Sequence, residues 1–430
     1  MAIRLDANDK SFEAAFRELL GAKRETSVDV NDVVTKIIAD VRVRGDEALV
    51  ELTNKFDRLS LTAKTLRIPD ADLDAALEAC DPATLDALKL AKSRIEAYHA
   101  RQKPEDSRFT DAAGVSLGHR WTAVGAVGLY VPGGTANYPS SVLMNAVPAK
   151  VAGVKRVVMV VPTPDDKVNP LVLAAARLAG VDEVYRVGGA QAVAALAYGT
   201  ATIAPVDKIV GPGNAFVAAA KRQVFGIVGI DMIAGPSEIL VIADGDNDPD
   251  WIAADLLSQA EHDESSQSIL ITDDADFATR VEEAVKRQLT LLPRETTATK
   301  SWADFGAVIV VKSLDDAVPL VDRLAPEHLE IALDEPEAMA AKISNAGAIF
   351  LGRYTPEAVG DYVAGSNHVL PTARSARFSS GLNVLDFMKR TSIVRCDAAS
   401  LAAIGPAAVA LATAEGLEAH GRSVSIRLNK

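Results

Sequence analysis

Four apolar runs between Val124 and Asn214 constrain the fold of this chain more than any other feature of its sequence. The runs are VGAVGLYVPGG, RVVMVVP, DEVYRVGGAQ and DKIVGPGN, and each ends in glycine or proline before a stretch that favours a helix. Strands buried on both faces show such uninterrupted apolar runs, and parallel strands need a crossover between them, usually a helix. The alternation therefore predicts an α/β unit with a parallel sheet.

A second series of the same kind begins near Glu238. The runs EILVIAD, QSILITDD, GAVIVV and HLEIAL alternate with helices, among them those expected near 251–260 and 277–289. The first 100 residues instead show helical spacing throughout. A chain of 430 residues exceeds the roughly 250 to 300 residues that one hydrophobic core accommodates. We therefore expect two α/β domains.

The segment 352–381 has no sustained period, yet it keeps aromatic, histidine and aspartate residues among its glycines, serines and prolines. Long irregular segments inside compact domains are usually functional. A short strand, TSIVRC, and an alanine-rich helix from about Ser400 to Glu415 are expected after it.

Charge and composition narrow the possible partners. The 45 basic and 58 acidic residues give a net charge of -13, without any block rich in lysine and arginine, so we expect no nucleic-acid partner. No long apolar window occurs and the N-terminus turns acidic at once, which favours a cytoplasmic protein that does not associate with membranes. The only cysteines, Cys80 and Cys396, lie far apart, which argues against a thiolate metal cluster or a disulfide framework. We expect both to be buried.

The stretch LSQAEHDESS is a candidate metal site. Gln259 and His262 are three residues apart at the end of an expected helix, so their side chains share one face. Asp361 in GDYVAGSNH and His420 in EAHGR are candidates for the remaining ligands. Such a set of nitrogen and oxygen ligands suits Zn²⁺, with Mn²⁺ or Co²⁺ as substitutes. The alternative for this stretch is a solvated helix end.

Two further motifs place polar groups beside expected strands. LAPEHLEIA contains Glu327 and His328, a carboxylate and an imidazole that could divide proton transfers between two steps; the alternative is a surface ion pair. Ser237 follows a Gly-Pro turn outside any G-x-S-x-G motif, so it is a candidate hydrogen-bonding group, not a nucleophile. A turn-forming role is its alternative.

Three glycine turns follow apolar strands and precede helices: YVPGG at 130–134, GGAQ at 188–191 and GPGN at 211–214. Ligands of open α/β sheets bind outside such strand ends. None of the three turns has the spacing of a dinucleotide or P-loop fingerprint. A dinucleotide would therefore bind here in a non-standard way.

Seven motifs, in order along the chain, resemble the histidinol dehydrogenase family: GLYVPGG, GPGNAFVAAAKRQV, IDMIAGPSE, LLSQAEHD, APEHLEI, AGSNHVLPT and AEGLEAHGRSVSIRL. The resemblance runs from about Val28 to Leu428. It implies a zinc-dependent and NAD-dependent homodimer that oxidises L-histidinol to L-histidinaldehyde and then to L-histidine, the last steps of histidine biosynthesis.

The resemblance also implies roles for individual residues. Glu327 and His328 match the acid–base pair of the family. One Zn²⁺ per subunit would be held by Gln259, His262, Asp361 and His420. Besides these four, the residues that match substrate contacts are Ser237, His328, His368 and Glu415. The residues that match NAD contacts are Tyr130, Gln191 and Asn214.

The two α/β units and the resemblance together lead us to expect two Rossmann-like domains with parallel-type sheets, plus small terminal segments involved in dimerisation. Residues 1–26 would form an N-terminal helical arm. Residues 27–129 together with 238–382 would carry the zinc and acid–base residues, and residues 130–237 the NAD contacts. Residues 383–430 would form a dimerisation segment that completes the active site of the partner subunit.

Three other functions fit parts of this pattern. A related zinc-dependent and NAD-dependent dehydrogenase could act on another hydroxylated metabolite, although His368 and Glu415 suit a cationic amino alcohol. A metallohydrolase would leave Tyr130, Gln191 and Asn214 without a role. A catalytically silent binding protein should have lost at least one metal or acid–base position, and none is lost.

Overall fold

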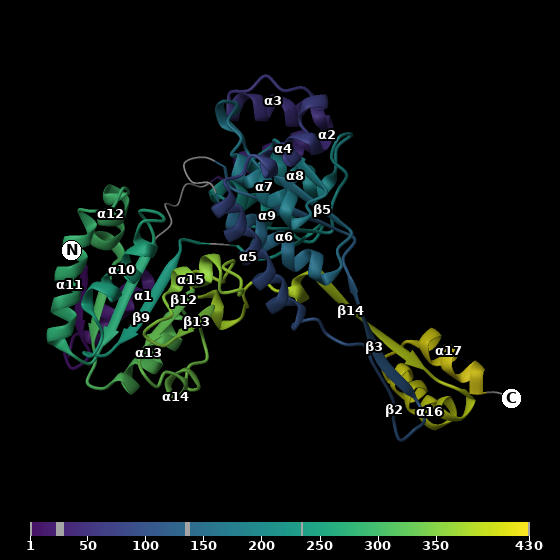
Figure 1. The fold of residues 1–430 in the computed structure, drawn as a ribbon. Helices are drawn as coiled ribbons and strands as arrows, with labels where there is room; N and C mark the ends of the chain where they lie inside the picture. Colours follow the sequence, from purple (N-terminus) through teal and green to yellow (C-terminus); the bar gives the residue numbers. More distant parts are fainter. Residues whose placement is uncertain (1, 23–29, 134–137, 234, 429–430) are drawn as a thin grey trace.

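The computed structural model describes residues 2–22, 30–133, 138–233 and 235–428, and every structural statement below concerns these residues. Two α/β bodies stand beside each other, and a small lobe containing the C-terminal helices projects away from them (Figure 1). The prediction of two α/β domains with parallel sheets is confirmed.

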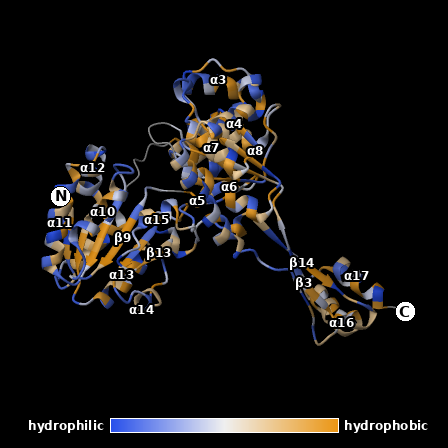
Figure 2. Ribbon diagram, in the orientation of Figure 1, coloured by the Kyte–Doolittle hydropathy of each residue, from blue (hydrophilic) through white to orange (hydrophobic). Residues whose placement is uncertain are grey.

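The first body is built on a six-stranded parallel sheet in the order β1-β11-β10-β9-β12-β13. Its strands are β1 (Ile3–Asp6), β9 (Glu238–Ala243), β10 (Gln267–Thr272), β11 (Ala307–Val310), β12 (His328–Ala332) and β13 (Ala348–Leu351). Every residue of β9 and β10 is buried, as their continuous apolar runs predict, and β9 stands out as hydrophobic in Figure 2.

Helices cover both faces of this sheet. One face packs against α1 (Phe12–Gly21), α13 (Ala317–Leu324) and α14 (Glu337–Ala340). The other packs against α10 (Pro249–Ala260), α11 (Ala275–Leu289) and α12 (Glu295–Phe305). The short helix α15 (Glu357–Tyr362) follows β13 and lies beside α10.

The second body is built on a five-stranded parallel sheet in the order β6-β5-β4-β7-β8. Its strands are β4 (Ala126–Tyr130), β5 (Arg156–Val160), β6 (Glu183–Tyr185), β7 (Lys208–Val210) and β8 (Gly229–Ile230). In sequence terms this order reverses between β4 and β7, and the order of the first sheet reverses in the same way between β9 and β12. The two bodies therefore share an architecture, each with one topological switch point.

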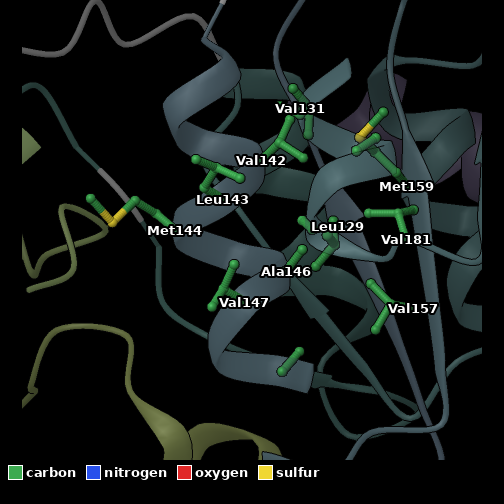
Figure 3. Close-up of a cluster of buried hydrophobic side chains, with 14 of the residues drawn as sticks. Leu129, Val131, Val142, Leu143, Met144, Ala146, Val147, Val157, Met159 and Val181 are labelled. Atoms are coloured by element: carbon green, nitrogen blue, oxygen red, sulfur yellow. The ribbon is translucent and has the colours of Figure 1, made fainter. Parts of the chain in front are cut away.

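Two sets of helices cover the second sheet. One face packs against α2 (Asn31–Arg44), α3 (Asp46–Asp57), α8 (Gly189–Tyr198) and α9 (Ala215–Val224). The other packs against α4 (Asp70–Glu78), α5 (Pro82–Ala100), α6 (Pro139–Ala152) and α7 (Pro170–Ala179). Figure 3 shows α6 laying Val142, Ala146 and Val147 against the core of this face. Nearly all of α6 is buried, so it lies inside the molecule.

The projecting lobe combines distant parts of the sequence. An antiparallel sheet in the order β14-β3-β2 joins β2 (Ser107–Thr110), β3 (Ser116–Ala123) and β14 (Met388–Arg395). Two helices, α16 (Ala398–Ala414) and α17 (Glu418–Leu428), pack against each other at its end (Figure 1). Short 3₁₀ turns complete the described elements: Ala63–Thr65, Pro164–Asp166, Leu314–Asp316, Ser375–Arg377 and Val384–Phe387.

The expected domain boundaries need correction. Residues 1–26 are more than a helical arm, since Ile3–Asp6 forms an edge strand of the first sheet. The helices of residues 31–100 cover the second sheet, not the first, because their apolar stripes complete its two cores. Residues 107–123 pair with β14 and so belong with the C-terminal segment. The second sheet begins at Ala126, slightly before the expected boundary at 130.

Within the described ranges, no helix combines the length and the apolar character that crossing a membrane requires. Cys80 is only half-buried and Cys396 is exposed, so the expectation that both are buried is wrong.

Candidate functional site

The acid–base candidates lie where the first sheet reverses its order. Glu327 directly precedes β12 and His328 is its first residue, while Ser237 directly precedes the neighbouring strand β9. His328 is level with Ile239 in the parallel register. These residues therefore occupy the amino ends of the strands, opposite to the end at which ligands of open α/β sheets usually bind.

The buried imidazole of His328 has a defined tautomer. Its Nδ1 lies 2.9 Å from the carbonyl oxygen of Glu238, and because a carbonyl only accepts, Nδ1 must carry the proton. Nε2 is buried and has no hydrogen-bond partner among the described residues. Burial also lowers the pKa of His328, which keeps the ring neutral. The lone pair on Nε2 is thus free to accept a proton.

Glu327 and Glu238 are joined by two reciprocal hydrogen bonds. The backbone N–H of Glu238 donates to Oε2 of Glu327 at 2.9 Å, and the backbone N–H of Glu327 donates to Oε2 of Glu238 at 3.3 Å. Burial raises the pKa of Glu327 well above its usual value, although the hydrogen bond from Glu238 opposes this. Nearby carboxylates raise it further. A raised pKa suits a carboxyl group that gains and loses a proton near neutrality.

The helix α15 brings two carboxyl groups to the free side of His328. Nε2 of His328 lies 3.5 Å from Oε1 of Glu357 and 3.8 Å from Oδ1 of Asp361. Burial, followed by the charge of Asp361, raises the pKa of Glu357 to about 9. Ser258 Oγ of α10 donates to Oε2 of Glu357 at 3.2 Å and ties the two helices together.

His368 approaches the same group from the irregular segment. Its Nδ1 donates to the carbonyl oxygen of Asp361 at 3.1 Å, and its Nε2 lies 3.3 Å from Oγ of Ser141 on α6. Asn367 donates to the carbonyl oxygen of Met144 at 2.7 Å. The segment 352–381 therefore joins the first body to α6 of the second, and the site lies between the two bodies.

Gln259 and His262 meet at the end of α10 as their spacing predicts. The Nε2 amide of Gln259 donates to Nδ1 of His262 at 2.9 Å. Gln259 is fully buried, and its Oε1 has no hydrogen-bond partner in the described part of the chain. His262 is close enough to oppose protonation of His328 and His368 by its charge. A buried carbonyl oxygen without a protein partner is costly, and a cation bound to Oε1 of Gln259 would offset that cost.

The donor set fits a metal ion. Besides Gln259 and His262, a potential ligand group is formed by His328, Glu357 and Asp361, whose nearest ligand atoms all lie within 4.8 Å of one another. Asp361 is common to this group and to the expected ligand set. Glu357 was not expected from the sequence, although its position four residues before Asp361 places both carboxylates on one helical face.

Two expected site residues are not brought to this cluster within one chain. Glu415 follows α16 and His420 lies in α17, and both are exposed on the projecting lobe (Figure 1). The other expected metal ligands, Gln259, His262 and Asp361, lie in the first body. A site that uses His420 together with these residues would need the lobe of a second chain.

The cofactor candidates lie at the carboxyl ends of the second sheet. Tyr130 ends β4, and the turn 211–214 follows β7, so the two flank the switch point. Tyr130 Oη accepts the backbone N–H of Gly189 at 3.0 Å, and burial raises the pKa of Tyr130 to about 12. The phenol therefore stays protonated. The crevice at a switch point is where ligands of such sheets bind.

Gln191 and Asn214 lie at the amino ends of α8 and α9, the helices that follow β6 and β7. Gln191 is buried in the first turn of α8, and its amide lies next to Gly189. Asn214 is exposed and caps α9, accepting the backbone N–H groups of Phe216 and Val217 through Oδ1 at 3.1 and 3.2 Å. Among the described residues, these are the hydrogen bonds of the Asn214 side chain. Gly134, the last residue of the first glycine turn, lies outside the described residues.

Histidinol dehydrogenases match this chain over nearly its whole length. A family model described as histidinol dehydrogenase matches residues 21–428. Among curated relatives, the histidinol dehydrogenase of Bradyrhizobium diazoefficiens is 68% identical over 429 residues, covering 100% of both chains. That of Rhodospirillum rubrum is 67% identical, covering 100% of this chain and 99% of its own.

A solved structure shows the same fold. The crystal structure of histidinol dehydrogenase from Elizabethkingia anophelis superposes with a TM-score of 0.95 at 36% identity. The match covers 99% of this chain and 98% of that one. The sequence matches and the shared fold extend over nearly every residue, and the chain therefore belongs to the histidinol dehydrogenase family.

Proposed function

We propose that this chain is a zinc-dependent homodimeric enzyme that oxidises L-histidinol to L-histidine through L-histidinaldehyde, reducing two NAD⁺. Its enzyme class, a dehydrogenase, follows from the family. The observation that carries the reaction is the buried His328, whose unprotonated Nε2 faces the acidic group of α15 at the boundary between the bodies.

The first oxidation needs a base for the hydroxyl proton and an acceptor for the hydride. Nε2 of His328 would take the proton, because burial keeps the ring neutral and Nδ1–H is committed to the carbonyl of Glu238. The hydride would leave to NAD⁺ held at the switch point of the second sheet, beside Tyr130 and Asn214. The products of this step are L-histidinaldehyde, NADH and a proton.

The second oxidation needs water to add to the aldehyde. The carboxylate of Glu327 would take a proton from that water, which gives a hydrated aldehyde with a hydrogen that can leave as hydride to a second NAD⁺. Its raised pKa makes it a stronger base than an exposed carboxylate. Zn²⁺, when bound by Gln259, His262, Asp361 and the partner's His420, would orient the nitrogen atoms of the substrate.

The surface of the lobe supports the dimer. Helix α16 is rich in alanine, yet its only buried residues are Ser400, Gly405 and Ala412. Large apolar side chains of the lobe are exposed in α16 and outside it: Phe109, Val394, Leu411, Leu417 and Ile426. Apolar side chains exposed together on one small lobe are the kind of surface that an interface between chains would cover. A partner seated there would bring Glu415 and His420 to the site of the other chain.

The stoichiometry of the reaction tests this function. Purified protein with Zn²⁺, NAD⁺ and L-histidinol should form two NADH for each histidinol consumed, because the oxidation of an alcohol to an acid removes four electrons. One NADH per histidinol would show an enzyme that stops at the aldehyde. No NADH from histidinol, with NADH from another hydroxylated metabolite, would favour the related dehydrogenase instead.

Replacing both cysteines should leave this activity intact. Neither Cys80 nor Cys396 lies near the acid–base cluster in the sequence, and Cys396 lies on the lobe after β14. The Cys80→Ser/Cys396→Ser variant should therefore keep both oxidation steps within about twofold of wild type, since no thiohemiacetal is required. The measurement is NADH formation from histidinol and from histidinaldehyde. Selective loss of aldehyde oxidation would point to a covalent thiol route.

A further inference from the structure

A buried ion pair between Lys221 and Asp231 contacts the main chain of the glycine turn 211–214. Lys221 belongs to α9, and Asp231 directly follows β8. Their side chains are 3% and 1% exposed, so both charges are removed from water. Neither residue was singled out in the sequence, because a lysine in an amphipathic helix and an aspartate after a short strand look like surface residues.

Both charges bind the main chain of one residue, Gly211. Oδ2 of Asp231 accepts the backbone N–H of Gly211 at 2.8 Å. Nζ of Lys221 donates to the carbonyl oxygen of Gly211 at 3.0 Å and also to Oδ1 of Asp231. The two side chains thus bind both the N–H and the carbonyl oxygen of Gly211. The contact between Lys221 and Asp231 joins the two side chains to each other.

The conformation and the surroundings of Gly211 require glycine at this position. Its φ of +106° is a conformation that side chains rarely adopt, and an added Cβ would collide with the carbonyl oxygen of Tyr130. The turn after β7 is therefore pressed against the end of β4. These are the two strands that flank the switch point.

A buried ion pair is an inefficient way to stabilise a fold, because removing two charges from water offsets most of their attraction. Apolar side chains of similar volume would fill the same space at least as well. What the pair supplies is a fixed position for one peptide unit. Three residues further along, Asn214 caps α9 through its Oδ1.

We propose that Lys221 and Asp231 are positioning residues for the nucleotide cofactor, which hold the turn 211–214 at the distance from Tyr130 that NAD⁺ binding requires. This inference rests on the proposed function, in which Tyr130 and Asn214 contact NAD⁺. Without the pair, the turn would relax away from β4 and the cofactor would lose its fixed contacts. The substrate cluster at His328 belongs to the first body and would not be affected directly.

The test separates the Michaelis constants of the two substrates. Lys221→Met should raise the KM for NAD⁺ about 10- to 100-fold, as expected for a binding group displaced by about 1 Å. The KM for histidinol should stay within about twofold of wild type. A purely structural role would reduce the amount of folded enzyme, which lowers apparent kcat but leaves both KM values unchanged. Unchanged or equally raised KM values would overturn the proposal.

Two further variants keep the proposal testable if Lys221→Met does not fold. Asp231→Asn keeps the shape and an acceptor for the N–H of Gly211 but removes the charge, and it should raise the KM for NAD⁺ less. Lys221→Arg keeps the charge and the donors and should restore most of the affinity. If the charge-removing and the charge-keeping variants bound NAD⁺ equally well, the ion pair would have no positioning role.

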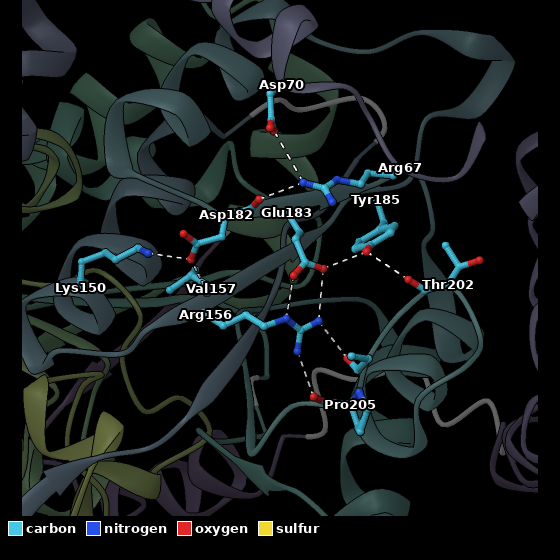
Figure 4. Close-up of polar contacts among 11 residues, drawn as sticks. Arg67, Asp70, Lys150, Arg156, Val157, Asp182, Glu183, Tyr185, Thr202 and Pro205 are labelled. Atoms are coloured by element: carbon cyan, nitrogen blue, oxygen red, sulfur yellow. Dashed lines mark hydrogen bonds and ion pairs between the residues drawn. The ribbon is translucent and has the colours of Figure 1, made fainter. Parts of the chain in front are cut away.

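A matched control lies at the other end of the same sheet. Arg156 and Glu183 pair at 2.7 Å at the amino ends of β5 and β6 (Figure 4). Arg156→Met removes a comparable, partly buried ion pair far from the carboxyl ends of the strands. It should lower the melting temperature without changing the KM for NAD⁺. An equal rise in that KM in the control would show that any loss of an ion pair in this domain acts alike.

Direct binding distinguishes failure of this inference from failure of the proposed function. Titration of NADH into the purified variants, followed by nucleotide fluorescence, needs no turnover. If wild type binds NADH but does not oxidise histidinol, the function is wrong, and the weaker binding expected of Lys221→Met still supports the positioning role. If wild type oxidises histidinol and Lys221→Met binds NADH as tightly, only the inference fails.

Discussion

Two inactive variants of this enzyme should restore activity to each other when they are mixed. His262→Asn and His420→Asn should each lose bound zinc and turnover as homodimers, because each lacks one proposed metal ligand. After subunit exchange, the mixture should recover about one quarter of wild-type activity, since half of the dimers are heterodimers with one intact site. Metal analysis and NADH formation on the same samples measure both effects.

The recovery follows from where the two histidines lie. His262 is beside Gln259 at the end of α10, whereas His420 is exposed on the projecting lobe. If the lobe of one chain completes the site of the other, a heterodimer pairs the intact His262 of one chain with the intact His420 of its partner. The second site of that heterodimer carries both substitutions and stays inactive.

A matched mixture provides the control. His262→Asn mixed with Gln259→Ala should recover nothing, because both substitutions lie in the same body and every site then carries one of them. Exchange of differently tagged subunits, followed by mass spectrometry, must show that heterodimers form in both mixtures. Heterodimers of the first mixture that remain inactive would mean that each chain completes its own site.

The two sheets could be predicted because the information for a buried strand is local. The runs that became β9 and β10 are apolar at nearly every position, and turns mark their ends. The strand Ile3–Asp6 was missed because three of its four residues are exposed at the sheet edge. In the lobe, the expected strand TSIVRC is confirmed as part of β14. The strands Ser107–Thr110 and Ser116–Ala123 were not predicted, since the first is exposed and the second mostly half-buried.

The assignment of the N-terminal helices could not be made from periodicity. The stripe of Val34, Ile37 and Val41 shows that one face of α2 is buried, and the structure confirms this. A stripe does not specify which of two similar sheets it covers. Only the assembled cores place α2 on the second sheet.

The candidate site was predictable to the extent that its residues form motifs. The side chains of Gln259 and His262 are in contact, and Glu327 and His328 are buried at the start of β12. Glu238 was overlooked because a carboxylate at the start of an apolar run resembles an ordinary strand boundary. Its exchange of hydrogen bonds with Glu327 depends on the pairing of β9 with β12, which no local pattern encodes.

Glu327→Gln should separate the two oxidation steps. Glutamine keeps the size of the side chain and an oxygen to accept the N–H of Glu238, but it cannot take a proton. We expect oxidation of histidinaldehyde to fall about 10² to 10⁴-fold, as is typical when a general base is removed. Oxidation of histidinol to the aldehyde should change far less, because His328 serves that step. NADH formation from each substrate, supplied separately, measures the difference.

The pH dependence of aldehyde oxidation provides a second test of the role of Glu327. Glu327 must be ionised to act as a base, and burial raises its pKa, so aldehyde oxidation by wild type should increase as pH rises through that raised pKa. Glu327→Gln should lose this limb of the profile. Glu335→Gln, an exposed carboxylate after β12, is the matched control and should leave both steps and the profile unchanged. If Glu327→Gln slowed both oxidations equally, Glu327 would serve a common step, and the division of proton transfers between Glu327 and His328 would be wrong.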